Sequence, residues 1–457
     1  MMNAYSPDLS MLFDSPSNKR LTALCFIVGV GLAILLSACS SGGAAPATEL
    51  SLESPTPEIQ YIIVTATPQP SPTASPTISP TPEASPPASA TRTPAPVATA
   101  GSATVTAVPA DAPAIPGRFD VYLGEPDDNN RQVLRWVDTD SGESITEILI
   151  VTDDGQAVRG GDTVYYLAPG TRQPMQANTA GAVQTLEFAA PPPSSTDYEL
   201  LPAANGAYLA WLVVEDLTFR ILVADAQGDV VTTAAEGAMA EGESISLVRL
   251  ANDGQRVFYE RRPDGITYQS IFRERYALFL ADLVTGRALR LPGEPACGEV
   301  FVCDAHISPD GSVLVRTLPP SVSSAPIIVT NLDSNSVILQ QAPTDVPSGA
   351  AYNVGYPLFT PGGELVYVLA FGAPGLESFR LMRSNLSNGQ QQIVANLGSE
   401  RHRPLGWAGD GVTLLTTREP AFYDTWQINI ETGALRQIAG MRWLGTITQA
   451  PTESAAP

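Results

Sequence analysis

Residue types that carry catalysis are scarce in this sequence of 457 residues. The chain has two histidines, His306 and His402, and it contains neither a Gly-x-Ser-x-Gly nucleophile elbow nor a phosphate-binding P-loop. These absences exclude the most recognisable hydrolase and nucleotide-binding motifs. The sequence therefore favours a protein without catalytic activity, and it indicates no cofactor and no metal.

Positive charge is scarce as well. No lysine follows Lys19, and 47 acidic residues against 25 lysines and arginines give a formal net charge of −22. A surface this acidic repels nucleic acid and anionic lipid headgroups. We expect no nucleic-acid partner, and the charge is also typical of a surface that keeps a protein soluble.

Helical periodicity is missing beyond Leu36. Apolar residues instead come in short runs separated by Gly, Pro, Asn and Asp, which is the pattern of strands and turns. The clearest turn is Ser308-Pro309-Asp310-Gly311, in which proline fixes φ and glycine accepts a positive φ. The fold is therefore predicted to be all-β.

Degenerate copies of this turn recur along the chain. Their glycines stand at positions 161, 206, 254, 311, 363 and 411. A second turn, led by Asp or Asn and ending in Gly or Asn, recurs seven times, most clearly at residues 282–286 and 429–433. A repeat of roughly 40–50 residues has the size of a four-stranded propeller blade.

Seven second turns against six first turns indicate one incomplete blade. Residues 118–150 provide only three strands, and residues 441–449 provide a fourth at the other end of the sequence. Pairing them closes the ring and removes two exposed sheet edges. We predict a seven-bladed β-propeller over residues 118–449, closed by the C-terminal strand and followed by a disordered tail at 450–457. A six-bladed ring is the alternative.

An export signal is predicted ahead of the propeller. Basic residues at the end of a polar segment precede an apolar run at 21–36, and a small-residue cleavage site follows. The tetrapeptide Leu-Ser-Ala-Cys that ends at Cys39 resembles the bacterial lipobox, whose cysteine is acylated. We expect a lipoprotein signal peptide at 1–38 and lipidation of Cys39. An uncleaved anchor is the alternative, and both place the rest of the chain outside the cytoplasmic membrane.

Residues 39–117 are rich in Ala, Pro, Ser and Thr. Such a composition cannot bury enough apolar surface to offset the entropy lost on ordering. We predict that this segment is a disordered, locally extended stalk.

Two cysteines fall inside the predicted propeller. Cys297 and Cys303 lie close together in a loop between blades, and outside the cytoplasm such a pair is expected to form a disulfide. Free thiols are one alternative. Zinc is another, but His306 is the only further ligand nearby and zinc requires more.

Other polar residues have two interpretations each. Both histidines precede a turn, on or beside a strand expected to line the central channel, where they are either a base or ligand or a plain part of the wall. The acidic runs 127–130 and 138–143 superficially resemble calcium loops. The second run is in register with the other second turns, which favours a hairpin.

A resemblance to a known family rests on two of these motifs. A strand, Ser-Pro-Asp-Gly and another strand at 307–315, with an Asp-led turn ending in Thr-Gly at 282–286, resemble the TolB-like family of β-propeller repeats. The N-terminal propellers of prolyl-oligopeptidase-type peptidases are similar. The resemblance implies the propeller fold and a binding role, because members mostly serve as protein-binding platforms of the cell envelope. It transfers no catalytic residue.

The longest predicted loop, residues 261–275, is the candidate binding face. It joins the second and third strands of a blade, on the face opposite the short turns. Its positive and aromatic side chains are Arg261, Arg262, Tyr268, Phe272, Arg273 and Arg275. Such residues often anchor interfaces, and long loops on a rigid scaffold often carry function. The alternative is that the arginines pair with local acids such as Asp264 and Glu274.

The sequence thus predicts a monomeric propeller, anchored by lipid at the bacterial surface or in the periplasm, that binds a protein, a peptide or a glycan. One alternative is a propeller enzyme, a lyase or hydrolase of extracellular polysaccharide. Another is a structural or sensor subunit of an envelope complex.

Overall fold

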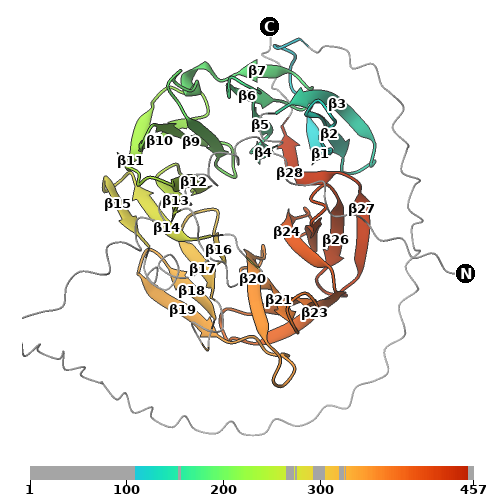
Figure 1. Ribbon diagram of the computed structural model, residues 1–457. Coiled ribbons are helices and arrows are strands. Elements are labelled where there is room, and N and C mark those ends of the chain that lie inside the picture. The colour runs from blue at the N-terminus through green and yellow to red at the C-terminus, as the bar shows by residue number, and fades with distance from the viewer. Residues whose placement is uncertain are drawn as a thin grey trace, which may run out of the picture. The chain divides into compact units, whose positions relative to one another are not determined.

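Seven four-stranded antiparallel sheets surround a central axis as blades (Figure 1). The computed structural model describes residues 109–152, 156–263, 272, 275–291, 304–318, 324 and 326–450. The predicted all-β, seven-bladed β-propeller is confirmed. The signal peptide, Cys39, most of the stalk, Cys297, Cys303 and residues 451–457 lie outside the described residues.

The blades follow one another along the chain, each written here from its innermost to its outermost strand. Blade 1 combines β28 (Arg442–Gln449), β1 (Gly117–Leu123), β2 (Arg131–Asp138) and β3 (Ser144–Val151). Blade 2 contains β4 (Ala157–Gly160), β5 (Thr163–Leu167), β6 (Pro174–Ala177) and β7 (Val183–Thr185). Blade 3 contains β8 (Asp197–Pro202), β9 (Tyr208–Glu215), β10 (Thr218–Asp225) and β11 (Thr232–Ala238).

The remaining four blades have the same order. Blade 4 contains β12 (Glu243–Leu250), β13 (Arg256–Pro263), β14 (Ala277–Asp282) and β15 (Arg287–Arg290). Blade 5 contains β16 (Asp304–Ile307), β17 (Val313–Thr317), β18 (Ile327–Asn331) and β19 (Ser336–Gln341). Blade 6 contains β20 (Tyr352–Phe359), β21 (Leu365–Phe371), β22 (Ser378–Ser384) and β23 (Gln391–Gly398). Blade 7 contains β24 (Arg401–Trp407), β25 (Thr413–Glu419), β26 (Thr425–Asn429) and β27 (Leu435–Ala439).

Blade 1 closes the ring by joining the two ends of the propeller. The C-terminal strand β28 pairs antiparallel with β1, from Gly117 opposite Gln449 to Leu123 opposite Arg442. The Asp120 carboxylate on β1 fastens this pair, because it accepts hydrogen bonds from Trp443 Nε1 at 3.1 Å and from Thr446 Oγ1 at 2.6 Å. The predicted sharing of one blade between distant segments is therefore confirmed.

The core lies between neighbouring blades. The second strands, such as β9 and β21, are nearly continuous apolar runs, as expected for strands covered on both faces. One core cluster joins Leu212 and Phe219 of blade 3 to Leu247 and Tyr259 of blade 4. The outermost strands are more exposed, as in β15 and β19. Each blade is therefore stabilised mainly by the blades beside it.

The predicted turns form as expected. Gly311 has a φ of +73° in the first type of turn, where Asp310 accepts the Ser312 N–H at 3.1 Å. In the second type, Asp282 accepts the N–H groups of Val284 and Thr285 at 2.9 and 3.0 Å. The seven innermost strands surround the central axis (Figure 1).

The one helical element among the described residues is a short 3₁₀ turn, Glu187–Ala189. In this part of the chain no helix is long and apolar enough to cross a membrane.

Removal of residues 441–457 tests the closure. We expect a fall in melting temperature of about 10 °C or more, since loss of each buried large apolar side chain costs about 1.5–3 kcal/mol and each kcal/mol corresponds to roughly 2 °C or more in a large domain. Trp443 and Ile447 are two such side chains. Thermal unfolding followed by circular dichroism measures the change. Removal of residues 451–457 alone is the control, and equal melting of both truncations would contradict the closure.

Candidate functional site

Two cavities open beside the central channel, and Arg275 and Arg403 line both of them. The smaller cavity, of about 190 Å³, lies against the inner strands of blades 5, 6 and 7. The larger, of about 340 Å³, lies against the inner strands of blades 2, 3 and 4. A groove of about 910 Å³ between blades 2 and 3 is larger still, but no Arg, Lys or His is among its lining residues. The two cavities beside the channel, and not this groove, therefore offer positively charged side chains to a ligand.

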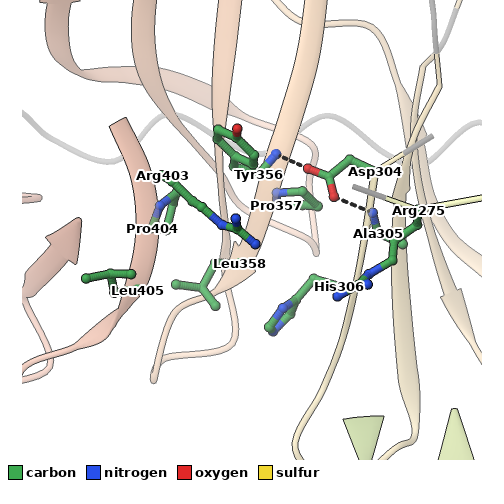
Figure 2. A pocket seen from close by; sticks show the side chains of 10 residues that line it. All are labelled: Arg275, Asp304, Ala305, His306, Tyr356, Pro357, Leu358, Arg403, Pro404 and Leu405. Atoms are coloured by element: carbon green, nitrogen blue, oxygen red, sulfur yellow. Dashed lines mark hydrogen bonds between the residues drawn. The ribbon is translucent and has the colours of Figure 1, made fainter. Parts of the chain in front are cut away.

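Five polar side chains converge on the smaller cavity (Figure 2). Asp304 and His306 come from β16, Tyr356 from β20, Arg403 from β24, and Arg275 from the residues just before β14. In Figure 2 the Arg403 side chain extends from β24 past the Tyr356 ring, and Arg275 lies beside His306. Three blades and one loop end are thus needed to assemble this site.

Tyr356 sits in an unusual backbone conformation at the centre of the site. Its φ is +52°, in the left-handed region, where a residue other than glycine costs about 1–3 kcal/mol. The strand is irregular here, with a register shift between Gly355 and Leu358. The buried Asp304 carboxylate accepts the Tyr356 N–H, and the Tyr356 hydroxyl donates to Glu419 at 2.7 Å. These bonds hold the ring at the channel wall.

Phe272 supports Tyr356 from behind. Its ring is fully buried and meets the Tyr356 ring edge-on, with centroids 5.0 Å apart. It also fills the space beside Gly355, where a Cβ atom would lie 2.1 Å from the Phe272 ring. Only glycine fits at this position. The segment before β14 is therefore packed into the core at Phe272.

Two arginines line both cavities, Arg275 and Arg403 of β24, and two more lie on innermost strands, Arg249 on β12 and Arg442 on β28. We call these four the channel arginines, and they come from four separated parts of the chain. Burial, and next Arg275, lower the pKa of Arg249. Burial, and next Arg403, lower the pKa of Arg442.

His306 is neutral in this environment. The ring is half-buried on β16. Burial, followed by the charges of Arg249 and Arg275, lowers its pKa to about 3. The imidazole can therefore both donate and accept a hydrogen bond at neutral pH.

The carboxylates near the channel arginines mostly accept hydrogen bonds from other groups. Glu260, which is 2% exposed, accepts hydrogen bonds from Arg262 at 2.7 Å and from the Tyr276 N–H at 2.6 Å, and its contact with Arg275 is longer, at 3.5 Å. Arg249 and Arg442 have no side-chain hydrogen bond or ion pair with the described part of the chain.

The structure divides the candidate binding face. Arg261 and Arg262 belong to β13, where Arg261 makes a two-pronged ion pair with Glu243 at 2.7 Å and Arg262 pairs with Glu260. Phe272 is buried and Arg275 lines the channel. Tyr268, Arg273, Asp264 and Glu274 lie outside the described residues. The face as a whole remains a prediction, and Arg275 is the member placed beside a cavity.

The other predicted polar sites have structural roles. His402 is buried in blade 7, with Nδ1 3.1 Å from Thr416 Oγ1 and its ring edge-on to Trp426. Asp138 accepts the N–H groups of Asp140 and Ser141, as the hairpin interpretation requires. Asp127 pairs with Arg131 at 2.6 Å. Among the described residues no three His, Cys, Asp or Glu side chains are grouped to hold a metal.

Sequence reasoning missed three of the channel arginines, which are Arg249, Arg403 and Arg442. Each lies on an innermost strand near the bulge or end of that strand. Aligning the repeats on their turn glycines and comparing the preceding strands would have revealed cationic residues in strands that face the axis.

Taken together, the fold and the channel define a β-propeller with a cationic centre, and solved structures similar to this chain include TolB and other propellers. TolB of Acinetobacter baumannii is 14% identical, with 71% of this chain and 82% of that chain covered and a TM-score of 0.37. An oligogalacturonate lyase in complex with manganese is 13% identical (71% and 86% covered, TM-score 0.44), and the periplasmic gluconolactonase of Pseudomonas aeruginosa is 12% identical (73% and 97%, TM-score 0.44). Such likeness extends to the fold alone. No protein-family profile and no curated protein matches the sequence.

The state of His306 predicts a pH dependence. Its pKa is lower in the folded protein than the ordinary 6.5, so the unfolded chain takes up a proton first as the pH falls. The stability of the wild type relative to His306→Gln should be constant above pH 6.5 and decline from there toward pH 3, by up to about 1.4 kcal/mol per pH unit. Denaturant unfolding of both proteins from pH 4 to pH 8 measures this difference. Parallel pH profiles would show that His306 is protonated normally.

Proposed function

We propose that this protein is a lipid-anchored β-propeller that lies outside the cytoplasmic membrane and binds an extracellular protein, peptide or glycan. The observation that supports a binding role is the gathering of the channel arginines in a chain whose formal net charge is −22. Neither the formation of ion pairs nor the need for a soluble surface explains why arginines would gather in this way. Arginine is also the residue that most often recognises carboxylate and phosphate groups.

The last residues of the predicted stalk, which the structure describes, support the proposed tethering of the propeller. Residues 109–116 run along blade 2, where Asn178, Thr179 and Gln184 donate side-chain hydrogen bonds to their carbonyl groups at 2.8–3.0 Å. These contacts fix this end of the stalk to the side of the propeller. An anchor at Cys39 would then tether the propeller to the membrane through the predicted extended stalk.

An enzyme acting on extracellular polysaccharide is the second candidate. It is favoured by the convergence of His306, Tyr356 and the arginines on one cavity. Two features argue against it. A base with a pKa near 3 accepts a proton weakly at neutral pH, and the Tyr356 hydroxyl already donates to Glu419. Binding therefore remains the primary proposal.

The anchor is tested by Cys39→Ala. We expect the variant to leave the membrane fraction or to accumulate unprocessed, because it lacks the acylated cysteine. Fractionation of cells and mass measurement of the mature protein distinguish these results. Cys25→Ala, which alters a cysteine inside the apolar run, is the matched control. Unchanged mass and membrane retention of Cys39→Ala would rule out lipidation.

The binding role is tested with the full-length protein against three kinds of probe. These are alginate as a carboxylated glycan, dextran as a neutral glycan, and a polyglutamate peptide. We expect at least one acidic probe to bind, and Arg403→Ser to weaken that binding at least about tenfold, or about 1.4 kcal/mol. Arg287→Ser, on the exposed strand β15, should leave it unchanged.

Product analysis in the same experiment separates the two candidates. Binding without change in the length of the glycan supports the binding role. Shortening of alginate or dextran that His306→Gln abolishes would favour the enzyme instead. Binding that Arg287→Ser weakens as much as Arg403→Ser would place the contact outside the channel.

A further inference from the structure

The groove between blades 2 and 3 has no role in the proposed function. It has a volume of about 910 Å³ and opens on the face of the short turns, because the turn residues Asp162, Asn205 and Gln227 line it. The strands of blade 2 contain four, five, four and three residues, whereas those of blade 3 contain six, eight, eight and seven. The shorter blade therefore leaves part of the side of blade 3 uncovered.

The described end of the stalk reaches the rim of this groove. Gln184 on β7 donates from Nε2 to the Ala110 carbonyl at 2.8 Å, and Gln176 on β6 donates to Gln184 at 3.1 Å. Gln176 is paired with Tyr165 on β5, and both residues line the groove. Tyr165 also packs in a core cluster with residues of blade 3. Since cross-strand partners share one face of a sheet, Ala110 lies on the side of blade 2 that faces blade 3.

A turn at this point sets the direction of the chain. The Ala112 N–H donates to the Pro109 carbonyl at 3.0 Å, which closes a four-residue β-turn. Residues 112–116 arrive over the turn of blade 2, where Asn178 and Thr179 bond to their carbonyl groups. Because a β-turn reverses the chain, the segment before Pro109 is directed back across the face of the short turns, beside the groove.

The sequence before Pro109 differs from the rest of the stalk. Residues 68–96 are rich in proline, but no proline lies between Pro96 and Pro109. Residues 103–108 read Ala-Thr-Val-Thr-Ala-Val, an uncharged run with the β-branched residues that are typical of strands. Six extended residues span about 20 Å, which is the length of an ordinary strand. This segment is therefore long enough to follow the side of a blade.

The walls of the groove suit an extended, uncharged segment. Phe188 is partly exposed and presents an apolar ring to it. Gln176 and Gln227 carry amides that can donate to backbone carbonyl groups, as the side chains that hold residues 109–116 already do. The charged lining residues, Asp162 and Glu187, are both acidic and can accept backbone N–H groups. The groove thus offers apolar contact and partners for both kinds of backbone group.

We propose that residues 103–108 occupy the groove between blades 2 and 3 and form part of the folded propeller. The valine side chains pack against Phe188, and the backbone bonds to the polar walls. The folded domain then begins at Ala103 instead of Arg118, and the groove is closed to an external ligand. The two cavities beside the channel remain the sites for such a ligand. The inference depends neither on the lipid anchor nor on the binding role proposed above.

Hydrogen exchange of the full-length protein, followed by mass spectrometry, tests the position of the segment. The amides of residues 103–108 should exchange at least about tenfold more slowly than those of an unstructured chain of the same sequence. Residues 88–93 are the internal control, because they are six residues of the same stalk without proline, and they should exchange at the unstructured rate. Unprotected exchange of both segments would overturn the proposal and leave the groove open to an external ligand.

The variant Gln227→Trp tests the groove itself. Gln227 is exposed in the turn between β10 and β11, so a larger side chain can fill the groove without replacing a core residue. Protection of residues 103–108 should then fall at least about tenfold. Gln437→Trp, at an exposed position of β27, is the matched control and should leave the protection unchanged. Protection that survives Gln227→Trp would place the segment elsewhere and reject the proposal.

The double variant Val105→Asp, Val108→Asp tests the segment. In the groove these carboxylates lose apolar contact and meet the acidic lining residues, so the melting temperature should fall by at least about 3 °C. Ile78→Asp, Val97→Asp makes the same change of charge elsewhere in the stalk, and it should leave the melting temperature as in the wild type. Equal melting of the two double variants would contradict the docking of residues 103–108.

Discussion

Closure of the ring is the constraint on which the rest of this structure depends. In a propeller the apolar core lies between blades, so each blade needs a neighbour on both sides. Blade 1 meets this need only when β28 returns to β1, and the Asp120 carboxylate fastens the two strands through Trp443 and Thr446. The next junction is tied in the same region, because Arg159 of β4 donates to the Thr446 carbonyl at 3.0 Å across the space that Gly445 leaves open.

Closure also determines the chemistry of the centre. Seven innermost strands converge on one axis. Residues of different blades, which are far apart in the sequence, therefore become neighbours at the centre although they share no blade. The Tyr356 site illustrates the consequence. Its strained backbone persists because Asp304 of blade 5, Glu419 of blade 7 and Phe272 from blade 4 all hold it. Strain maintained by three other blades is typical of a site whose geometry matters, and here it positions an aromatic ring against Arg403, whose Cζ lies 5.9 Å from the ring centroid.

The parts of this structure that were predictable are those encoded locally. A turn needs only proline, glycine and an Asx residue in sequence, so the two recurring turns revealed the blades, their number and the shared blade. Contacts between blades have no such local signal. Phe272 was assigned to a binding surface because aromatic residues in loops often anchor partners, but Gly355 on another blade leaves the space that buries it. Likewise, nothing in its own strand distinguishes Arg403, and only the arrangement of the blades places it with Arg275 at both cavities.

The distribution of charge limits which acidic ligands the proposed binding platform would accept. A chain with a formal net charge of −22 repels every anion at long range, but screening at physiological salt limits this repulsion to about 8 Å. A small anion crosses that zone at little cost and would then meet Arg275 and Arg403 at the two cavities, where a contact is stronger than in water. A long polyanion would keep most of its charge against the acidic surface and gain the same few contacts. The cost grows with the length of the ligand and the gain does not, so an acidic ligand of this platform would be compact or would bind through the end of a chain.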